Sequence, residues 1–302
     1  MDSLRRYASI IDDFDAFLAA SERPLSHTVR VQTSRVSVDR VVDAFEEAAI
    51  GCSPLSWRES IIELDIDRPG LTLPAFLGWV HGQEVVSCLP APLLDVVPGD
   101  VIWDACAAPG SKTGHLIDLI EDVGTVVATD DNLGRLSALR YNLERLGATA
   151  AIVERADARR FDPSPMGIEA FDASLVDAPC TGEGTVRKKP SALDDWSLGH
   201  VESLGNVQRG ILRRAIELTK PGGVVLYSTC TYAPEENEAV VDAILDDGGC
   251  DIEPIELPFE TAPGIDSWEG TAFDHRLTRA RRIYPHHADT GGFFIAKLRV
   301  AT

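Results

Sequence analysis

From Val101 onward, short apolar segments alternate along the chain with longer segments of helical periodicity. This alternation is typical of a parallel sheet whose strands are joined by crossover helices. Leu133, Leu136, Leu143 and Leu146, for example, recur at helical spacing and are followed by Gly147, a residue type that commonly ends helices. The pattern therefore predicts an α/β domain. Its expected strands are Val101 to Asp104, Thr125 to Asp130, Ala151 to Arg155, Ala173 to Asp177 and Gly223 to Thr229.

Two further strands are expected near the end of the chain, at Arg282 to Tyr284 and Phe293 to Leu298. Only a short glycine-containing loop separates them, and parallel neighbours need a much longer crossover. We therefore expect an antiparallel hairpin at the edge of the sheet. This ending differs from that of a simple dinucleotide-binding fold, which would add another parallel strand.

The segment from residue 1 to about 95 reads as a separate, small α+β unit. Apolar residues recur at helical spacing between Ile10 and Leu18, Val29 and Val31 alternate with polar residues as in a strand, and a second helix is expected from Ser37 to Gly51. Residues 53–98 are rich in proline and glycine, so irregular strands and a linker are expected there.

The composition is that of a folded globular protein. With 302 residues, 44% of them hydrophobic, the chain can bury a substantial core. It contains no apolar run of the roughly 18 residues that a membrane helix needs, so we expect a soluble, cytoplasmic protein with no membrane contact. Its cysteines show no C-x-x-C pair and no zinc spacing, so neither disulfides nor a metal site is expected. They are Cys52, Cys88, Cys106, Cys180, Cys230 and Cys250.

The net charge of −20, with only five lysines, is the opposite of the basic surface expected of a nucleic-acid binder. Taken alone, it argues against RNA as a partner. A protein that works in very high salt is an alternative explanation, because salt near 1 M screens charge repulsion within about 3 Å. We state this halophilic origin as a hypothesis.

A run of small residues follows the first expected strand of the α/β domain. Small side chains and Gly110 let the backbone approach a ligand closely, and the following helix would offer free N–H groups. A simple helix cap would also use proline and glycine. A phosphate-binding P-loop is disfavoured, because Ser111 separates Gly110 from Lys112 and position 105 is alanine. The run comprises Asp104, Ala105, Cys106, Ala107, Ala108, Pro109, Gly110, Ser111, Lys112 and Thr113.

Carboxylates end the next two strands. Asp130 lies twenty residues after Gly110, where nucleoside-binding folds place an acceptor for ribose hydroxyls, and Asp157 follows the third strand within reach of an adenine amino group. Each could instead be a turn or helix cap. Together with the glycine loop they favour a cofactor of nucleoside type.

Cysteines follow the fourth and fifth strands: Cys180 comes three residues after Asp177, and Cys230 directly follows Thr229. In a sheet of strand order 3-2-1-4-5 these strands are neighbours about 4.8 Å apart, so both sulfurs should open onto one crevice. Two buried structural cysteines are the alternative.

Such a pair suits methylation at C5 of cytosine, which is a poor nucleophile. A thiolate that adds to C6 activates C5 toward a sulfonium methyl group, after which the C5 proton leaves and the thiolate is expelled. Two cysteines can divide these tasks. Asp177 is placed to hydrogen-bond the N3 and exocyclic amine edge of the ring.

These residues resemble the RsmB/Sun-type RNA (cytosine-C5) methyltransferases. The resemblance covers residues from about 75 to 302 and is carried by DACAAPGSKT, DAPCTGEGTVRKKP, STCTYAPEENEAVV and RIYPHHADTGGFFIA. It implies a Rossmann-like class I methyltransferase sheet with an antiparallel final strand, preceded by the small α+β domain. We accordingly divide the chain into an RNA-recognition domain with its linker, residues 1–95, and a catalytic domain that depends on S-adenosylmethionine, residues 96–302.

The resemblance also implies roles for individual residues. Cys230 attacks C6, Cys180 assists release of the product, and Asp177 and Lys112 face the base. Arg135 is a weaker transfer, as a basic residue near the cofactor. The implied S-adenosylmethionine pocket is lined by Cys106, Ala107, Ala108, Pro109, Gly110, Ser111, Lys112, Asp130, Asp157 and Asp177.

The motif wording is closest to the tRNA-modifying branch, so tRNA is favoured over ribosomal RNA as the partner, and no obligatory protein partner is evident. RNA contacts are expected at local exceptions to the acidic surface. His286 and His287 are expected to be loop structure rather than catalysts. An RNA-binding assembly factor without turnover, or a methyltransferase for a small molecule or protein, are the alternatives. The expected RNA contacts are Arg187, Lys188 and Lys189, and the cluster Arg279, Arg281 and Arg282.

Overall fold

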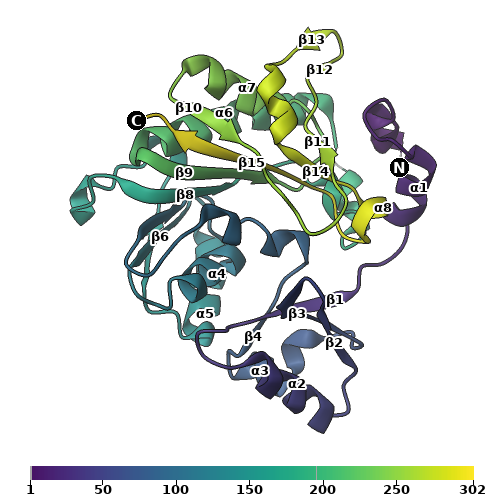
Figure 1. The fold of residues 1–302 in the computed structure, drawn as a ribbon, viewed down its shortest axis with the longest axis vertical. Helices are drawn as coiled ribbons and strands as arrows, with labels where there is room; N and C mark the ends of the chain where they lie inside the picture. Colours follow the sequence, from purple (N-terminus) through teal and green to yellow (C-terminus); the bar gives the residue numbers. More distant parts are fainter. Residues whose placement is uncertain (1, 195) are drawn as a thin grey trace. The chain divides into compact units, whose positions relative to one another are not determined.

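The structure is a computed structural model that describes residues 2–194 and 196–302 (Figure 1). The described chain divides into two compact units: Ser26–Asp157 form one, and the segment ending at Leu25 joins Ala158–Thr302 in the other. This division follows contacts and does not test the functional boundary at residue 95, which stays a prediction. Within the described ranges, no helix is long and apolar enough to cross a membrane.

The first part of the unit Ser26–Asp157 is an antiparallel sheet of order β2-β3-β1-β4. Val29 and Val31 of the sheet share a core with Val41 and Phe45 of α2, because the helix turns its apolar face toward the strands. The expected strand at Val29 and Val31 is confirmed. The elements are β1 (His27–Val31), α2 (Val38–Glu47), β2 (Cys52–Leu55), β3 (Arg58–Leu64), α3 (Leu73–Phe76) and β4 (Val80–Gly82).

Two expectations for this part need correction. The helix after Ser37 is capped by the Ser37 hydroxyl as expected, but it ends at Glu47 because Ala49 already takes a left-handed conformation with φ 55°. The region after residue 53 begins with a regular hairpin rather than irregular strands. Ile61 and Ile62 of β3 are adjacent and both fully buried, so the strand lacks the alternation by which half-buried strands are recognised.

The second part of this unit has parallel strands in the order β5-β6-β7, as the sequence predicts. Helix α5 begins after Asn132, whose side chain accepts from the Arg135 N–H, and ends at Gly147 with φ 64°. The elements are β5 (Val101–Asp104), α4 (Ser111–Leu119), β6 (Thr125–Asp130), α5 (Leu133–Leu146) and β7 (Ala151–Arg155).

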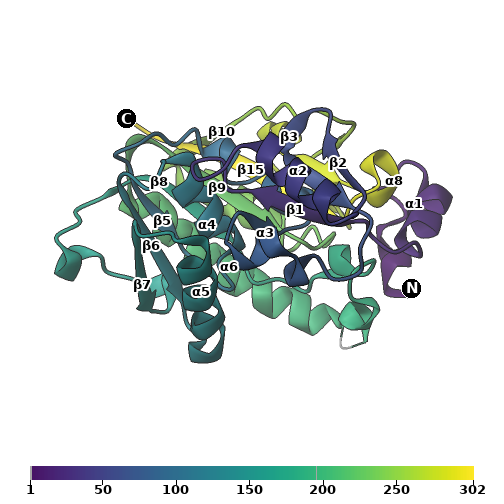
Figure 2. The same cartoon turned by 90° about the horizontal axis from the view of Figure 1, so that it is seen from below.

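The other unit contains the parallel neighbours β8 and β9, with helix α6 packed against both (Figures 1 and 2). The final strand, β15, is antiparallel to β9 on one side and to β14 on the other, which confirms the expected hairpin. Strand β9 begins four residues earlier than expected, because a register shift after Phe171 lets Thr219 join the ladder. The elements are β8 (Phe171–Asp177), α6 (Leu198–Leu218), β9 (Thr219–Thr229), α7 (Glu238–Asp247), β10 (Cys250–Glu253), β11 (Ala262–Pro263), β12 (Ser267–Trp268), β13 (Thr271–Ala272), β14 (Arg281–Ile283), α8 (Pro285–Ala288) and β15 (Phe293–Val300).

The N-terminal segment packs into this same unit. Of the apolar residues between Ile10 and Leu18, only those from Phe14 onward are helical, in α1 (Phe14–Ser21), which begins after the Asp13 cap; a separate 3-10 helix spans Asp2–Tyr7. Tyr7 and Phe17 are fully buried in a cluster with Tyr232 and Tyr284. The segment from Leu4 to Leu18 therefore shares a core with residues from far along the chain.

Candidate active site

The two cysteines singled out by the sequence lie side by side at the ends of β8 and β9. The strands are in parallel register, with Asp177 opposite Ser228, so the loops that carry Cys180 and Cys230 begin together. Their sulfur atoms are 3.3 Å apart, and the Cys230 N–H donates to the Cys180 sulfur over 3.4 Å. Both are free cysteines. The juxtaposition expected from strand order is therefore present.

The environment of Cys180 favours its protonated form. The hydrogen bond with Cys230 raises the pKa of the Cys180 thiol well above its ordinary value, and burial and the nearby Glu236 carboxyl act in the same direction. Cys180 is therefore held in its thiol form. A protonated sulfur 3.3 Å from a second cysteine suits a pair in which one sulfur attacks and the other supplies a proton.

Asp177 is oriented by the neighbouring strand. The Ser228 hydroxyl donates to one oxygen of the half-buried Asp177 carboxylate over 2.8 Å. Since Ser228 lies two residues before Cys230, the same strand end fixes both the carboxylate and the sulfur.

A buried carboxylate, Glu183, ties the two cysteine loops together. The hydroxyls of Thr181 and Thr231, each next to a cysteine in sequence, both donate to one of its oxygens. Tyr7 and Trp196 donate to the other oxygen over 2.7 and 2.6 Å. Because Glu183 is fully buried, these donors replace the water that its carboxylate loses on folding.

A second carboxyl group, Glu236, lies on the other side of Thr181. Its oxygens accept from the Thr181 N–H and from the Gln208 side chain over 3.1 and 2.7 Å, and it also contacts the Thr181 hydroxyl. Burial raises the pKa of Glu236 to about 7, with the Glu183 carboxylate adding to the effect. Protonated Glu236 can donate to Thr181, which in turn donates to Glu183.

Replacing Glu236 with glutamine is expected to change the pH dependence of stability. The raised pKa means that folding retains a proton that the unfolded chain releases, so this contribution is complete below about pH 4.5 and is lost as pH rises through about 7. Glutamine mimics the protonated acid at every pH. Urea unfolding should therefore show the variant gaining about 2 kcal/mol relative to the wild type between pH 5.5 and 8.

The matched control is Glu202→Gln on the exposed surface of α6, which should keep the wild-type pH profile. Parallel profiles for wild type and Glu236→Gln would contradict a protonated Glu236.

The sequence reasoning did not identify this carboxylate network. Thr181 and Glu183 lie within the motif after β8, and Thr231 and Glu236 lie within the motif after β9. The signal that could have found them is the acidic residue a few positions after each cysteine. Nothing local in the sequence indicates that these acids are buried.

The glycine-rich loop between β5 and α4 belongs to the unit Ser26–Asp157. Gly110 takes φ 102°, and its N–H donates to Ala107 O over 2.7 Å, so the loop turns sharply into the helix. A cis peptide bond joins Ala108 to Pro109. The Lys112 ammonium donates to the Ser87 hydroxyl over 3.0 Å. Cys106 and the small residues around it thus form a compact turn before the helix.

Replacing Gly110 with alanine is expected to destabilise this unit by about 2 kcal/mol, because its left-handed φ strains a side chain. A Cβ would also lie 2.7 Å from the Leu139 Cδ1 atom, so α5 would have to give way. Thermal unfolding measures the loss. Gly199→Ala is the control, since no atom lies within 4 Å of its Cβ position, and equal effects of the two changes would contradict the argument.

The carboxylates after β6 and β7 occupy adjacent parallel strands. Asp130 is buried, accepts from the Asn132 N–H over 3.0 Å and pairs with Arg135 at 3.2 Å. Arg135 also donates to Ala108 O, so it joins the glycine loop to Asp130. Asp157 follows β7 and is half-buried.

The expected RNA contacts need correction at two arginines. Arg187 is buried and donates to Arg23 O, Pro24 O and Thr290 O, so it holds loops together rather than facing solvent. Arg282 is also buried and pairs with Glu238. Lys188 and Lys189 are exposed.

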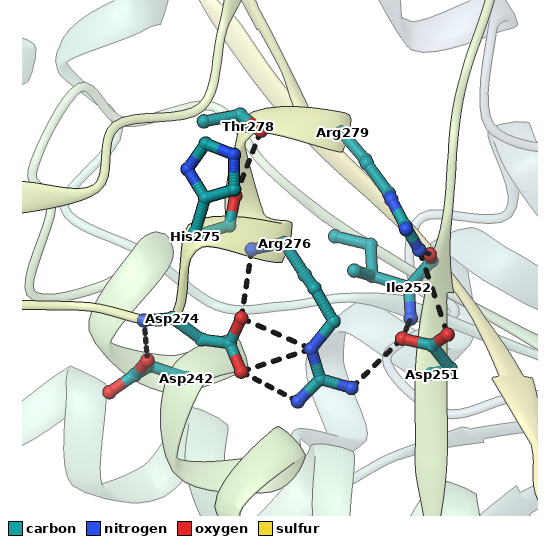
Figure 3. A network of polar contacts seen from close by, with 8 residues as sticks. All are labelled: Asp242, Asp251, Ile252, Asp274, His275, Arg276, Thr278 and Arg279. Atoms are coloured by element: carbon teal, nitrogen blue, oxygen red, sulfur yellow. Dashed lines mark hydrogen bonds and ion pairs between the residues drawn. The ribbon is translucent and has the colours of Figure 1, made fainter.

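Arg279 is already engaged by the protein itself. Its guanidinium donates to Ile252 O over 2.8 Å and lies 3.6 Å from Asp251, beside a second arginine, Arg276, which pairs with Asp251 and Asp274 (Figure 3). Arg281 donates to main-chain carbonyls of its own turn. The basic cluster expected to contact RNA therefore serves mainly to hold this loop to α7 and β10.

Comparison with solved structures identifies the fold. A methyltransferase homolog protein from Pyrococcus horikoshii superposes with a TM-score of 0.82 at 31% identity, over 94% of this chain and 90% of that one. The structure of NSun6 from Pyrococcus horikoshii with SFG superposes with a TM-score of 0.81 over 95% of this chain and 94% of that one. At 23% identity, the second likeness concerns the fold alone. The fold and the paired cysteines define a class I methyltransferase.

Sequence comparison gives the family. Residues 91–299 match the family described as 16S rRNA methyltransferase RsmB/F. The tRNA (cytosine(49)-C(5))-methyltransferase of Pyrococcus abyssi is 34% identical over 98% of this chain and 94% of its own length. The ribosomal RNA small subunit methyltransferase F of Aeromonas salmonicida is 35% identical over 94% of this chain, which spans 60% of that relative. The chain belongs to the RsmB/F family of RNA (cytosine-C5) methyltransferases.

Proposed function

We propose that this RNA (cytosine-C5) methyltransferase acts on tRNA, takes the methyl group from S-adenosylmethionine and uses Cys230 as its nucleophile. The observation that carries the proposal is the 3.3 Å separation of the Cys230 and Cys180 sulfurs, together with the raised pKa of Cys180. The choice of tRNA as the substrate rests on the Pyrococcus abyssi relative, which this chain matches over 94% of the relative's length. Ribosomal RNA is the second candidate, supported by relatives of which the chain spans 60%.

In the proposed reaction the Cys230 thiolate adds to C6 of the cytosine, which makes C5 nucleophilic. Asp177, held by Ser228, hydrogen-bonds the N3 and exocyclic amine edge and stabilises the activated ring. Bound S-adenosylmethionine supplies an electrophilic methyl group. The C5 proton then passes to water, the C5–C6 double bond forms again and the C6–sulfur bond breaks. Cys180 donates its thiol proton to the departing Cys230 sulfur, 3.3 Å away, and the proton returns to Cys180 before the next turnover.

The residues of the unit Ser26–Asp157 fit the cofactor by their chemistry. Asp130 would accept hydrogen bonds from the ribose hydroxyls and Asp157 from the adenine amino group, since both follow adjacent parallel strands. Gly110 turns the loop without a side chain, which leaves its backbone free to lie close to a ligand. Lys112 would face the base. The remaining proposed lining within this unit comprises Cys106, Ala107, Ala108, Pro109, Ser111 and Arg135.

We propose that residues 1–95 contribute RNA recognition. Supporting this, Phe76 in α3 is 78% exposed, beside the exposed Leu73. A solvent-facing aromatic ring can stack on an unpaired base at any salt concentration, whereas phosphate contacts weaken as salt rises. This mode suits a chain whose surface is acidic.

The test of the proposed function is methyl transfer from labelled S-adenosylmethionine to purified tRNA and, in parallel, to ribosomal RNA. We expect 5-methylcytosine in tRNA, and lower incorporation in a Phe76→Ala variant of unchanged stability. Incorporation only into ribosomal RNA would overturn the tRNA assignment. RNA binding without any incorporation would instead favour an assembly factor, and methylation of a small molecule or protein alone would place the chain in a different class.

We also propose that the enzyme is cytoplasmic and that it is halophilic. The net charge of −20 supports the halophilic origin. Repulsion among surface carboxylates weakens as salt screens them, so stability should increase with salt. We expect the protein to unfold below about 1 M potassium chloride. Circular dichroism across a salt series measures this, and full stability in dilute buffer would refute the halophilic origin.

A further inference from the structure

A histidine pair and an aspartate meet at one point of the unit that contains both cysteines. Asp12 precedes α1 near the start of the chain, whereas His286 and His287 lie in α8. The Nε2 atoms of His286 and His287 are 2.9 and 3.2 Å from the same Asp12 oxygen. The candidate ligand atoms of the three residues all lie within 4.8 Å of one another, close enough to share one ion.

The surroundings hold these rings in place and leave one side open. The His286 and His287 side chains are only 8% and 6% exposed, whereas the Asp12 side chain is 64% exposed. His286 lies nearly parallel to the Tyr284 ring, with centroids 5.8 Å apart, and meets Phe17 edge-on. An ion could therefore reach the nitrogens from the side of the carboxylate, and water could complete its coordination.

We propose that Asp12, His286 and His287 bind a divalent transition-metal ion of the zinc class. Two imidazole nitrogens and one carboxylate oxygen are a donor set that Zn²⁺ accepts, with a further position left for water. Magnesium and calcium prefer oxygen ligands throughout, so the imidazoles select against them. The ordinary hydrogen bonds from both rings to Asp12 are the arrangement that the ion would replace.

The proposed site binds its ion exchangeably rather than permanently. The Nδ1 atoms of both histidines are buried, and neither has a hydrogen-bond partner among the residues the structure describes. On metal binding through Nε2, the ring proton moves to Nδ1, where metal-ligating histidines usually find an acceptor. The absence of an acceptor for the Nδ1 proton weakens metal binding, so we expect a dissociation constant for Zn²⁺ on the order of micromolar.

The site links the N-terminal segment to the loop that follows Cys180. Arg187 in that loop donates to Arg23 O and to Thr290 O, both over 2.9 Å. In the segment that follows α8, the Gly292 N–H donates to Gly184 O, in the Cys180 loop, over 2.8 Å. An ion that holds Asp12 to α8 would therefore stiffen the contacts that support the cysteine loop.

The sequence predicts no metal here, because that expectation rests on ligands close together along the chain. Asp12 and His286 are 274 residues apart. Only the packing of the N-terminal segment against α8 brings the three donors together.

The test is calorimetric titration of metal-free protein with Zn²⁺ alone. The protein carries Cys180→Ser and Cys230→Ser, because the neighbouring thiols would themselves bind zinc. We expect one Zn²⁺ per chain, at least a tenfold weaker affinity in His286→Gln and in Asp12→Asn, and no binding of Mg²⁺. The exposed His200→Gln is the matched control and should bind as the parent does.

Cobalt substitution adds a direct readout. Bound Co²⁺ should give visible d–d absorption bands typical of nitrogen coordination with the parent protein, and these bands should be absent with His286→Gln. A cooperative urea-unfolding transition, measured with a chelator present, checks that each metal-free variant is folded. No Zn²⁺ binding up to millimolar concentration, or equal affinity in the parent and His286→Gln, would overturn the proposal. The protein with Cys180→Ser and Cys230→Ser lacks both proposed catalytic sulfurs and is not expected to methylate RNA, so the zinc titration is independent of the proposed function.

Discussion

Replacing Cys180 with alanine is expected to leave the protein covalently attached to its RNA. Cys230 can still add to C6 in this variant, because its sulfur and its strand end at Thr229 are unchanged. The thiol that lies 3.3 Å from Cys230 and retains its proton is lost, so release is slowed. We expect turnover to fall by about 10²–10⁴-fold, the usual range for removing a proton-transferring group.

Denaturing electrophoresis with labelled RNA measures this outcome, since a covalent complex survives denaturation. Cys230→Ala should form no complex and should lose activity by at least about 10⁴-fold, because the nucleophile itself is missing. The double variant should behave like Cys230→Ala. Cys52→Ala, at a cysteine in the other compact unit, is the control and should turn over normally. A trapped complex with Cys230→Ala instead would reverse the assignment of the two roles.

Replacing Glu183 with alanine is expected to destabilise the unit that carries both cysteines by about 4 kcal/mol. The change leaves the buried Tyr7 hydroxyl and the partly buried Trp196 N–H without an acceptor, and a buried unsatisfied group costs about 1–3 kcal/mol. The hydroxyls of Thr181 and Thr231 lose the acceptor that they share. Both cysteine loops should therefore loosen together.

Urea unfolding should rank the variants by the acceptors that remain. Glu183→Gln keeps one acceptor oxygen and should lose about half as much stability as Glu183→Ala. Glu202→Ala, on the exposed face of α6, removes a carboxylate without buried partners and should unfold close to the wild type. In the Cys180→Ala background, in which the covalent RNA complex accumulates, adding Glu183→Ala at a temperature where the protein is folded should slow formation of that complex. Equal midpoints for Glu183→Ala and Glu202→Ala would contradict the proposed role of this carboxylate.

Much of the parallel sheet and the cysteine pair could be predicted from the sequence. Helix α5, between its Asn132 and Gly147 caps, and the parallel order of β5, β6 and β7 follow from periodicity and capping residues. Cys180 and Cys230 could be brought together because adjacent parallel strands end at the same edge of a sheet. In each case the information lies within a few turns of chain, or follows from a general rule of strand order.

Charged residues were predicted less well, because their environment depends on distant partners. Arg187 reads as a surface residue in the sequence, yet carbonyl acceptors as far away as Arg23, 164 residues earlier, allow it to be buried. Arg282 is buried because Glu238 compensates the loss of hydration. The hairpin of β2 and β3 was missed for a related reason: Ile61 and Ile62 are both covered, and only the tertiary structure supplies cover for both faces.

The sequence by itself determined the α/β class, the parallel strands and the pairing of the two cysteines, since periodicity and strand order are local or follow general rules. The tertiary structure decided which polar groups serve the site. Tyr7 reaches Glu183 across 176 residues, and Asp12 reaches His286 across 274. A buried carboxylate is stable only where donors converge on it, and convergence from opposite ends of the chain is a property of the folded molecule.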